Sequence, residues 1–309
     1  MSPLFPPLLK KGSTIGVVAP SSASDQDELD AGLERLHDLG YKTKLAGNLT
    51  TKTHYLAGDK GTRLNETVKM LTDDAVDAVF CARGGDGAIH LLPEFVERMK
   101  DAKPKIFLGY SDITLLQLVL YKYYNWVTFA GPMISTELGP KNLTDAAESH
   151  LWTTLTNSPD QWNLNPSEDH AVEVWRKGSV RGSLVGGCLA LVTALLGSPH
   201  MPDMSGTILI IEDIDETPRH VDRMLHRLRI SGIFDQISGL IVGQFRGCFP
   251  EDPGEDFTLK ELVLNATQEY DFPILGNYPY GHKTPERLTI PIGVPIQMET
   301  EPVQITVDV

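Results

Sequence analysis

The strongest constraint on the fold is an alternation of short apolar runs with segments of helical periodicity, repeated along the first half of the chain. Apolar runs at Thr14–Ala19, Val76–Cys81, Lys105–Leu108 and Trp126–Met133 predict strands, and a helical pattern follows each of them. Strands joined by helices pair in parallel through right-handed crossovers. The pattern therefore predicts an α/β fold built on a parallel sheet.

A polar, turn-rich passage follows these units and includes Asn157–Asp160 and Asn165–Asp169. We place the domain boundary there. The expected division is an N-terminal α/β domain over residues 1–160, a linker over 161–178 and a C-terminal domain over 179–309.

The C-terminal part has a different pattern of predicted strands and helices. Buried strands are predicted at Thr207–Ile211 and Gly239–Phe245, and Thr258 opens a helix with a capping box completed by Glu261. Three short apolar runs then finish the chain, at residues 288–290, 294–298 and 303–307. Runs so short and close together predict an antiparallel ribbon.

Composition limits the possible partners of this chain. Its 309 residues are 41% hydrophobic and carry a formal net charge of -14, which argues against a nucleic-acid partner. We find neither a secretory signal nor an apolar run near the roughly 20 residues that span a bilayer, so no membrane association is expected. Three scattered cysteines favour a reducing, cytoplasmic setting.

The turn after the third predicted strand reads Gly109-Tyr110-Ser111-Asp112, and a helical segment follows it. At the carboxyl end of a strand in an open α/β sheet, the chain faces the crevice where ligands bind. Backbone N–H groups at the start of the helix could stabilise an oxyanion formed when Ser111 attacks a carbonyl. The alternative interpretation is that Ser111 only caps the helix, since serine is a preferred N-cap residue.

A glycine-rich turn, Arg83-Gly84-Gly85-Asp86-Gly87, follows the second predicted strand. A dinucleotide fingerprint would need glycine where His90 stands, and Asp86 would repel a pyrophosphate. The functional interpretation is a second backbone N–H for an oxyanion, opposite the amide of Asp112; the alternative is a tight turn without a ligand. Cys81 is a rival nucleophile, although a cysteine at the end of a buried strand usually serves packing.

Two further candidates lie in the second half. Glu212 is the first polar residue at the end of a buried strand, whereas Asp213, Asp215 and Glu216 are expected to be caps or solvated charges. His282 lies in a glycine-flanked loop, where a lone histidine is more often inert.

Ser111, Glu212 and His282 could act as nucleophile, orienting acid and general base. Their order along the chain matches that of the α/β-hydrolases, but the Gly-x-Ser-x-Gly elbow of that family is missing because Ile113 stands at its second glycine. Metal binding finds little support: His220, Asp222 and His226 share one predicted helix without a metal-binding motif, and we interpret them as a solvated face.

Taken together, these motifs resemble the LD-carboxypeptidases, or muramoyltetrapeptide carboxypeptidases, whose relatives include the microcin C self-immunity peptidases. The matching segments, in family order, are Val17–Ser21, Tyr55–Gly58, Ala82–Gly85, Gly109–Thr114, Gly131–Met133, Gly186–Gly187, Ile211–Asp213, Asp222–Leu225, and Gly281–His282 with Leu288–Gly293. They cover nearly the whole length.

The resemblance implies an N-terminal flavodoxin-like or amidotransferase-like sheet layer and a smaller, β-rich C-terminal α/β domain. It implies Ser111 as nucleophile, His282 as general base, Glu212 as its orienting acid, and the backbone amides of Gly85 and Asp112 as the oxyanion hole. The implied reaction releases the terminal D-alanine from peptidoglycan tetrapeptides during cytoplasmic murein recycling. No cofactor or metal is implied, and the protein is expected to be a homodimer.

Two positions depart from the family pattern. Asp86 stands where the family usually has tyrosine, and His90 stands where it has arginine. If they contact the substrate, they would suit a more cationic ligand. Two alternatives therefore stay open: a microcin C immunity-type peptidase that cleaves aminoacyl-nucleotide conjugates, and a binding protein that has kept the scaffold without the chemistry.

Overall fold

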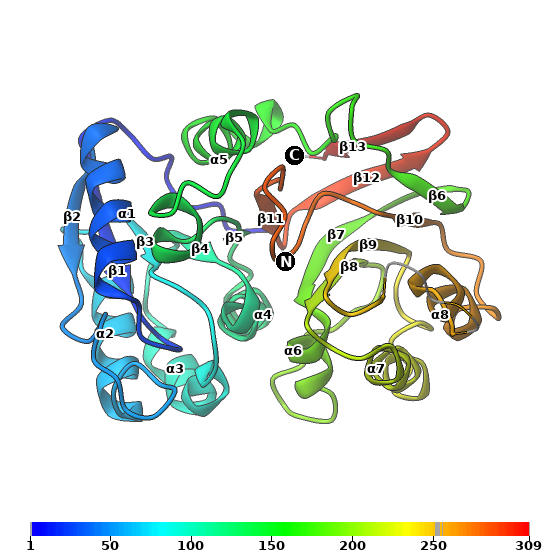
Figure 1. Cartoon of the computed structure of the whole chain (residues 1–309), viewed down its shortest axis with the longest axis horizontal. Helices are drawn as coiled ribbons and strands as arrows, with labels where there is room; N and C mark the ends of the chain where they lie inside the picture. Colours follow the sequence, from blue (N-terminus) through cyan, green and yellow to red (C-terminus); the bar gives the residue numbers. More distant parts are fainter. Residues whose placement is uncertain (1, 251–253, 255, 309) are drawn as a thin grey trace. The chain divides into compact units, whose positions relative to one another are not determined.

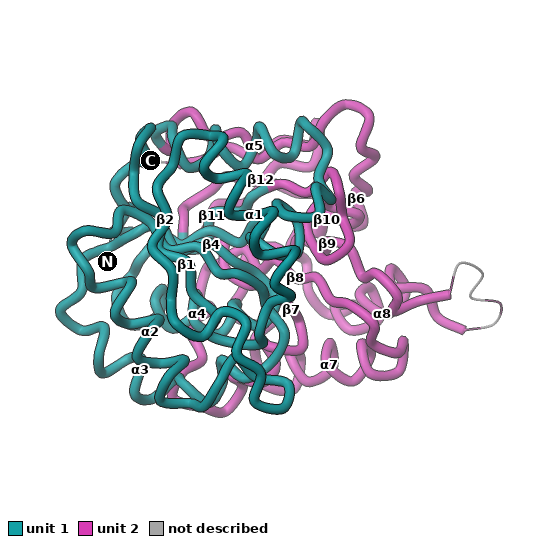
Figure 2. The backbone as a smooth tube through the Cα atoms, turned by 60° about the vertical axis from the view of Figure 1, so that its left-hand side comes forward, with its two compact units in different colours: residues 1–158, 289–293 teal, residues 159–288, 294–309 magenta. Residues whose placement is uncertain are grey.

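The computed structural model describes residues 2–250, 254 and 256–308. The chain divides into two compact units, one comprising residues 1–158 with 289–293 and the other residues 159–288 with 294–309 (Figure 2). The strands and helices of each unit are labelled in Figure 1.

The first unit is built on a six-stranded sheet with the order β11-β5-β4-β3-β1-β2. Its strands are β1 (Thr14–Val18), β2 (Lys42–Leu45), β3 (Ala78–Cys81), β4 (Ile106–Gly109), β5 (Thr128–Ala130) and β11 (Ile290–Ile292). All neighbouring pairs are parallel except β11 with β5. The predicted parallel α/β sheet is confirmed.

Five α-helices accompany this sheet: α1 (Gln26–Asp38), α2 (Lys60–Thr72), α3 (Leu92–Met99), α4 (Thr114–Tyr124) and α5 (Asp145–Thr156). Short helical turns lie at η1 (Ala88–Leu91), η2 (Ser111–Ile113) and η3 (Ile134–Leu138). The strand order reverses between β1 and β3, which makes the carboxyl ends of these strands the topological switch point where open α/β sheets bind ligands. The loops that begin at Pro20 and Ala82 lie there.

The second unit contains a seven-stranded sheet with the order β13-β12-β7-β8-β9-β10-β6. Its strands are β6 (Glu173–Arg176), β7 (Ser179–Cys188), β8 (Ile208–Ile214), β9 (Gly239–Arg246), β10 (Ile274–Gly276), β12 (Pro295–Thr300) and β13 (Val303–Val307). Strands β7 to β10 are parallel, and the flanking strands are antiparallel. The helical segments are η4 (Pro159–Gln161), α6 (Leu189–Ala194), α7 (Pro218–Ile230) and α8 (Leu259–Ala266).

The three C-terminal runs do not form one ribbon. Strands β12 and β13 pair as predicted, but β11 joins β5 in the sheet of the first unit. Ile290 and Ile292 are fully buried there. Pro291, which has no N–H to donate, is tolerated because β11 is an edge strand.

The structure also differs from the expectation of a linker over 161–178, because this segment contains β6, which pairs with β10. Strand β7 was missed because Gly182, Gly186 and Gly187 make it look like a loop. A Cβ at Gly186 would lie 1.9 Å from the Ile210 carbonyl oxygen on β8. These glycines therefore permit close approach of backbones within the sheet.

Candidate active site

Ser111 lies in the first unit on a strained turn between β4 and α4. Tyr110 is extended, Ser111 has φ of 65°, and η2 and α4 follow directly. A left-handed conformation is costly for a residue with a Cβ and is typical of functional turns. The N-cap positions of η2 and α4 are occupied by Tyr110 and Ile113, so Ser111 is not the N-cap of either helical segment.

The glycine-rich turn after β3 lies against Ser111. A Cβ at Gly84 would lie 2.9 Å from Ser111 Cβ and 3.0 Å from its Oγ. Gly85 has φ of 109°, and a Cβ there would lie 2.2 Å from Ser22 Oγ. Both positions therefore require glycine, and the turn brings backbone close to the Ser111 hydroxyl. The roles of the Gly85 and Asp112 amides in an oxyanion hole stay predictions.

The buried side chain of Asp112 connects three loops around Ser111. Its Oδ2 accepts a hydrogen bond from Ser21 Oγ at 2.6 Å and another from the Ala88 backbone N–H at 2.7 Å. Burial raises the pKa of this carboxyl group, while these two hydrogen bonds and the charge of Arg63 oppose the shift. Through these hydrogen bonds the Asp112 carboxylate connects the loops after β1 and β3 to the turn that carries Ser111.

Asp86 and His90, the two departures from the family pattern, are exposed next to this turn. The Asp86 backbone N–H donates to Ser22 Oγ at 3.2 Å. His90 Nδ1 lies 3.2 Å from Arg63 Nη2. Because a guanidinium only donates, Nδ1 is the acceptor in this pair. Contact of Asp86 or His90 with a substrate stays a prediction.

Cys81, the rival nucleophile, is fully buried in β3, and burial raises the pKa of its thiol well above the usual value. A thiol in this environment is inert, because the thiolate is the nucleophilic form. The residue serves packing.

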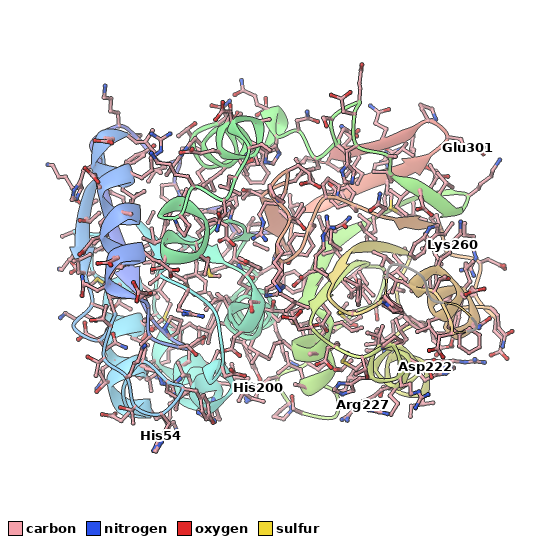
Figure 3. The ribbon with its side chains drawn as sticks, viewed as in Figure 1. His54, His200, Asp222, Arg227, Lys260 and Glu301 are labelled. Atoms are coloured by element: carbon pink, nitrogen blue, oxygen red, sulfur yellow. The ribbon has the colours of Figure 1, made fainter. Side chains whose placement is uncertain are left out.

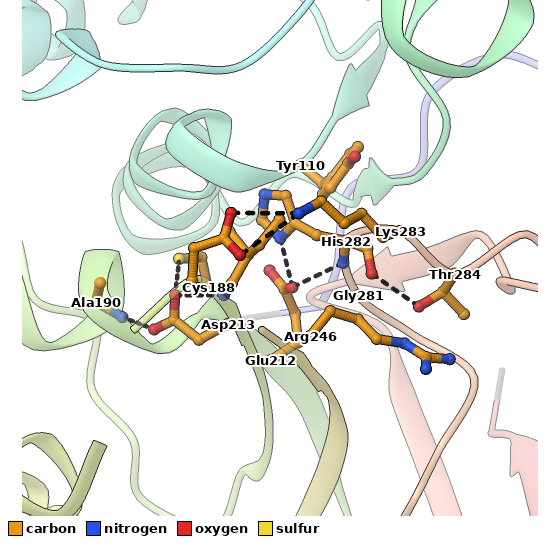
Figure 4. A network of polar contacts seen from close by, with 12 residues as sticks. Tyr110, Cys188, Ala190, Glu212, Asp213, Arg246, Gly281, His282, Lys283 and Thr284 are labelled. Atoms are coloured by element: carbon orange, nitrogen blue, oxygen red, sulfur yellow. Dashed lines mark hydrogen bonds and ion pairs between the residues drawn. The ribbon is translucent and has the colours of Figure 1, made fainter. Parts of the chain in front are cut away.

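The second unit brings Glu212 and His282 together (Figure 4). Glu212 lies on β8 with no exposed surface, and its Oε2 lies 2.7 Å from His282 Nδ1. The same oxygen accepts the backbone N–H of His282 at 3.0 Å. A carboxylate on Nδ1 fixes the tautomer in which Nε2 carries the lone pair of a general base.

The loop that carries His282 is held on several sides. Gly281 has φ of 142°, and a Cβ there would lie 3.1 Å from Glu212 Oε2 and 2.9 Å from the Gln244 carbonyl oxygen. Thr284 Oγ1 donates to the His282 carbonyl oxygen at 3.0 Å, and the buried Arg287 donates to the Gly281 carbonyl oxygen. The imidazole is therefore positioned by its backbone as well as by Glu212.

The other acids at this end of β8 have separate partners. Asp213 is buried; its Oδ2 accepts the Ala190 backbone N–H at 2.9 Å, and burial raises its pKa to about 6 (Figure 4). Asp215 pairs with Lys283 at 3.3 Å on the surface, and Glu216 pairs with His220. Asp215 is a solvated charge, as expected. Asp213 differs from the expectation, because it is buried and its carboxylate binds the start of α6 (Leu189–Ala194) and does not cap the following helix, α7.

The three residues weighed as metal ligands lie on α7, where Figure 3 labels Asp222. His226 Nε2 lies 3.5 Å from Asp222 Oδ1, and both side chains are more than 40% exposed. Within residues 2–250, 254 and 256–308, no three His, Cys, Asp or Glu side chains are grouped so that they could hold a metal ion. In the same ranges, no helix is long and apolar enough to cross a bilayer.

The candidate residues divide between the two units. Ser111, Asp112, Gly85, Asp86 and His90 lie in the first, and the structure gathers them around the carboxyl ends of β3 and β4. Glu212 and His282 lie in the second and are hydrogen-bonded to each other. Sequence reasoning missed the buried Arg63, which donates to the carbonyl oxygens of Pro20 and Gly87 beneath the glycine turn.

Known proteins of one family match this chain over nearly its whole length. Residues 15–131 match the model of the LD-carboxypeptidase N-terminal domain, and residues 181–298 match that of the C-terminal domain. A probable murein peptide carboxypeptidase of Bacillus subtilis is 36% identical over 300 residues, which cover 96% of this chain and 91% of the relative. The microcin C7 self-immunity protein MccF of Escherichia coli is 27% identical over 333 residues, 99% of this chain and 96% of that protein.

Solved structures of the same family have the same fold. The muramoyltetrapeptide carboxypeptidase of Oxalobacter formigenes superimposes with a TM-score of 0.79 at 28% identity, covering 96% of this chain and 98% of that one. MccF in complex with glutamyl sulfamoyl guanosine gives a TM-score of 0.88 at 24% identity, with 99% of each chain covered. The chain described here therefore belongs to the LD-carboxypeptidase family of serine peptidases.

Proposed function

We propose that this protein is an LD-carboxypeptidase that hydrolyses the amide between the L-centre of meso-diaminopimelate and the terminal D-alanine of murein tetrapeptides. The observation that carries the proposal is the buried Glu212 carboxylate, which orients His282 through its Nδ1 at 2.7 Å. The 36% identity to a protein named as a probable murein peptide carboxypeptidase supports this choice of substrate.

In the first half of the reaction, Ser111 Oγ attacks the scissile carbonyl carbon while His282 Nε2 takes the hydroxyl proton. The backbone amides of Asp112 and Gly85 donate to the oxyanion of the tetrahedral intermediate. His282 then gives its proton to the amide nitrogen, the C–N bond breaks, and D-alanine leaves. The remaining peptide is held as an ester on Ser111.

In the second half, His282 Nε2 takes a proton from water, whose oxygen attacks the ester carbonyl. Collapse of the second tetrahedral intermediate returns the proton to Ser111 and releases the tripeptide. The Glu212 carboxylate stabilises the imidazolium that forms twice in the cycle. Because Glu212 is excluded from solvent, its charge acts on His282 in a medium of low dielectric constant.

Mass spectrometry of a defined set of muropeptides after incubation with the protein tests the proposal, because it identifies the bond that is cut. We expect tetrapeptides to yield tripeptides and free D-alanine, and tripeptides to stay intact. Tetrapeptides that remain unchanged, or that are cut at another bond, would contradict the proposal.

A microcin C immunity-type activity is the second candidate, in which the same residues cleave an aminoacyl-nucleotide conjugate. It is supported by the 27% identity to MccF, which extends over 99% of this chain. Turnover of an aminoacyl sulfamoyl adenosine and of a murein tetrapeptide, measured side by side, separates the two candidates. We expect kcat/KM to be higher for the tetrapeptide.

The cytoplasmic location and the homodimer stay predictions. Light scattering coupled to gel filtration measures the second directly, and a mass of about 34.0 kDa would correspond to a single chain.

A further inference from the structure

A pocket of about 330 Å³ opens in the second unit near the carboxyl ends of β9 and β10. Its lining includes Glu173, Trp175, Gln244, Phe249, Lys260 and Asn277. We call it the Trp175 pocket. Its volume lies within the range of small-molecule sites, and its walls combine aromatic rings with a few polar groups, as such sites do.

The Trp175 pocket adjoins the loop that carries His282. The Gln244 backbone N–H donates to the Tyr280 carbonyl oxygen at 2.8 Å, and the Gln244 carbonyl oxygen lies 2.9 Å from where a Cβ of Gly281 would be. Gly281 in turn lies against Glu212 Oε2. A group bound in this pocket is therefore close to the Glu212–His282 pair within the same unit.

The side chain of Gln244 is fixed so that its oxygen is left for a ligand. Its Nε2 donates to Asn277 Oδ1 at 2.8 Å and to the Tyr278 carbonyl oxygen at 3.1 Å, which uses both amide hydrogens. Both of the side-chain hydrogen bonds found for Gln244 within the described residues use Nε2, and neither uses Oε1. This oxygen is a pre-oriented acceptor in the wall of the pocket, available to a donor such as an ammonium group.

Trp175 forms a rigid apolar wall. A Cβ at Gly276 would lie 2.0 Å from Cε2 of the indole ring, so the ring lies directly against the backbone of β10. The indole N–H donates to Glu173 Oε2 at 2.7 Å, which sets the orientation of the ring. Together with Phe249, this wall suits an aliphatic chain.

Opposite charges meet at this pocket. Lys260 Nζ lies 3.6 Å from Glu173 Oε2, and about half of each side chain is exposed. An exposed ion pair of this kind contributes little to stability, so a ligand that offers both an ammonium and a carboxylate can replace it. The pocket thus has matched partners for the two ends of a zwitterion.

We propose that the Trp175 pocket binds the zwitterionic amino-acid end of a substrate side chain. Glu173 and Gln244 Oε1 accept hydrogen bonds from its ammonium group, Lys260 donates to its carboxylate, and Trp175 packs against its methylene groups. The identity of the ligand rests on the proposed function, since in a murein tetrapeptide this group is the distal end of meso-diaminopimelate.

Two tetrapeptides test the pocket, one with meso-diaminopimelate at the third position and one with L-lysine, which lacks the distal carboxylate. We expect the wild type to favour the diaminopimelate peptide in kcat/KM by about tenfold or more. Lys260→Met should remove most of this preference through a higher KM for the diaminopimelate peptide alone. Glu173→Gln should weaken the binding of both peptides, since both carry the ammonium group.

Lys177→Met is the matched control, because Lys177 is an exposed lysine paired with Glu301 at 2.5 Å outside the pocket. It should leave the preference unchanged. A preference that survives Lys260→Met, or one that is absent from the wild type, would overturn the proposal.

Calorimetric binding of both peptides to Ser111→Ala and to Ser111→Ala/Lys260→Met separates this proposal from the proposed function. One possible outcome is that the wild type cleaves neither peptide, whereas Ser111→Ala binds the diaminopimelate peptide more tightly than the lysine peptide, and the added Lys260→Met substitution abolishes this difference. In that case only the reaction assignment fails. Equal binding of the diaminopimelate peptide by both variants, or no binding by either, would overturn the role of the pocket.

Discussion

One oxygen of Glu212 holds His282 at two points: Oε2 accepts the backbone N–H at 3.0 Å and lies 2.7 Å from the ring Nδ1. The carboxylate is completely buried, and among the described residues its other oxygen has no hydrogen-bond partner. A buried carboxylate with an unsatisfied oxygen is costly. This cost is consistent with a catalytic role, in which the charge of Glu212 is needed by an imidazole that becomes positively charged.

Glu212→Gln should lower kcat by about a thousandfold or more while the protein stays folded. The amide has nearly the shape of the carboxylate, but it neither carries the charge nor enforces the Nδ1–H tautomer of His282. Steady-state kinetics with a murein tetrapeptide measures the rate, and thermal unfolding reports whether the fold is retained.

Asp222→Asn is the matched control, because Asp222 also faces a histidine, His226, at 3.5 Å but on the exposed surface of α7. Its kcat should stay within about twofold of the wild type. A near-normal rate in Glu212→Gln would show that another acid orients His282.

Replacing Ser111 by glycine should make the protein inactive yet more stable than Ser111→Ala, by about 1 kcal/mol. Ser111 has φ of 65°, which a residue with a Cβ adopts only with strain, whereas glycine adopts it freely. Denaturant unfolding of the two variants measures the difference. Equal stabilities would indicate that the turn stores no strain at this residue.

Gly84→Ala should lower kcat by roughly tenfold or more and destabilise the protein by about 1–3 kcal/mol. The new methyl group would lie 2.9 Å from Ser111 Cβ, so the nucleophile or the glycine turn must move. Gly47→Ala serves as the control, since a Cβ there has nothing within 4 Å. If both variants keep full activity, the contact between the glycine turn and Ser111 does not matter for the reaction.

The buried Asp213 should make the protein less stable as the pH rises from about 4 to 6. Burial raises the pKa of this carboxyl group from 3.8 in the unfolded chain to about 6, so the folded state binds the proton more tightly. The stabilising contribution of protonated Asp213 is complete below pH 3.8 and is lost as the pH rises through 6.

The loss amounts to about 2–3 kcal/mol relative to Asp213→Asn, which does not titrate. Urea unfolding of both proteins between pH 3.5 and 7 measures it, with the exposed Asp215→Asn as the control. A difference between wild type and Asp213→Asn that does not vary with pH would contradict the burial of a titrating group.

The sequence predicts those parts of the fold and site that depend on local patterns. The apolar run that ends at Gly109 identifies the strand before Ser111, and the uninterrupted run before Glu212 singles out that acid among four neighbouring carboxylates. The capping box of Thr258 and Glu261 is likewise present at the start of α8. Each of these signals lies within a few residues of the feature that it predicts.

The missed features depend on distant partners. Strand β7 looks like a loop until the β8 backbone is placed next to Gly186, and β11 is recognised as a strand of the first sheet only through β5. The Trp175 pocket requires β6, which a four-residue run of mixed polarity does not predict. The pairing of Glu212 with His282, 70 residues apart, has no local signal: the residue types made it one possibility, and the resemblance then assigned the roles.

The most direct test of the account is labelling with a serine-reactive phosphonate followed by peptide mapping of the modified protein. If His282 activates Ser111, the wild type carries a single adduct, located on the peptide that contains Ser111. The His282→Ala variant is then labelled roughly a hundredfold more slowly, or slower still. An adduct on a different residue, or labelling of Ser111 at the same rate in His282→Ala, would contradict it.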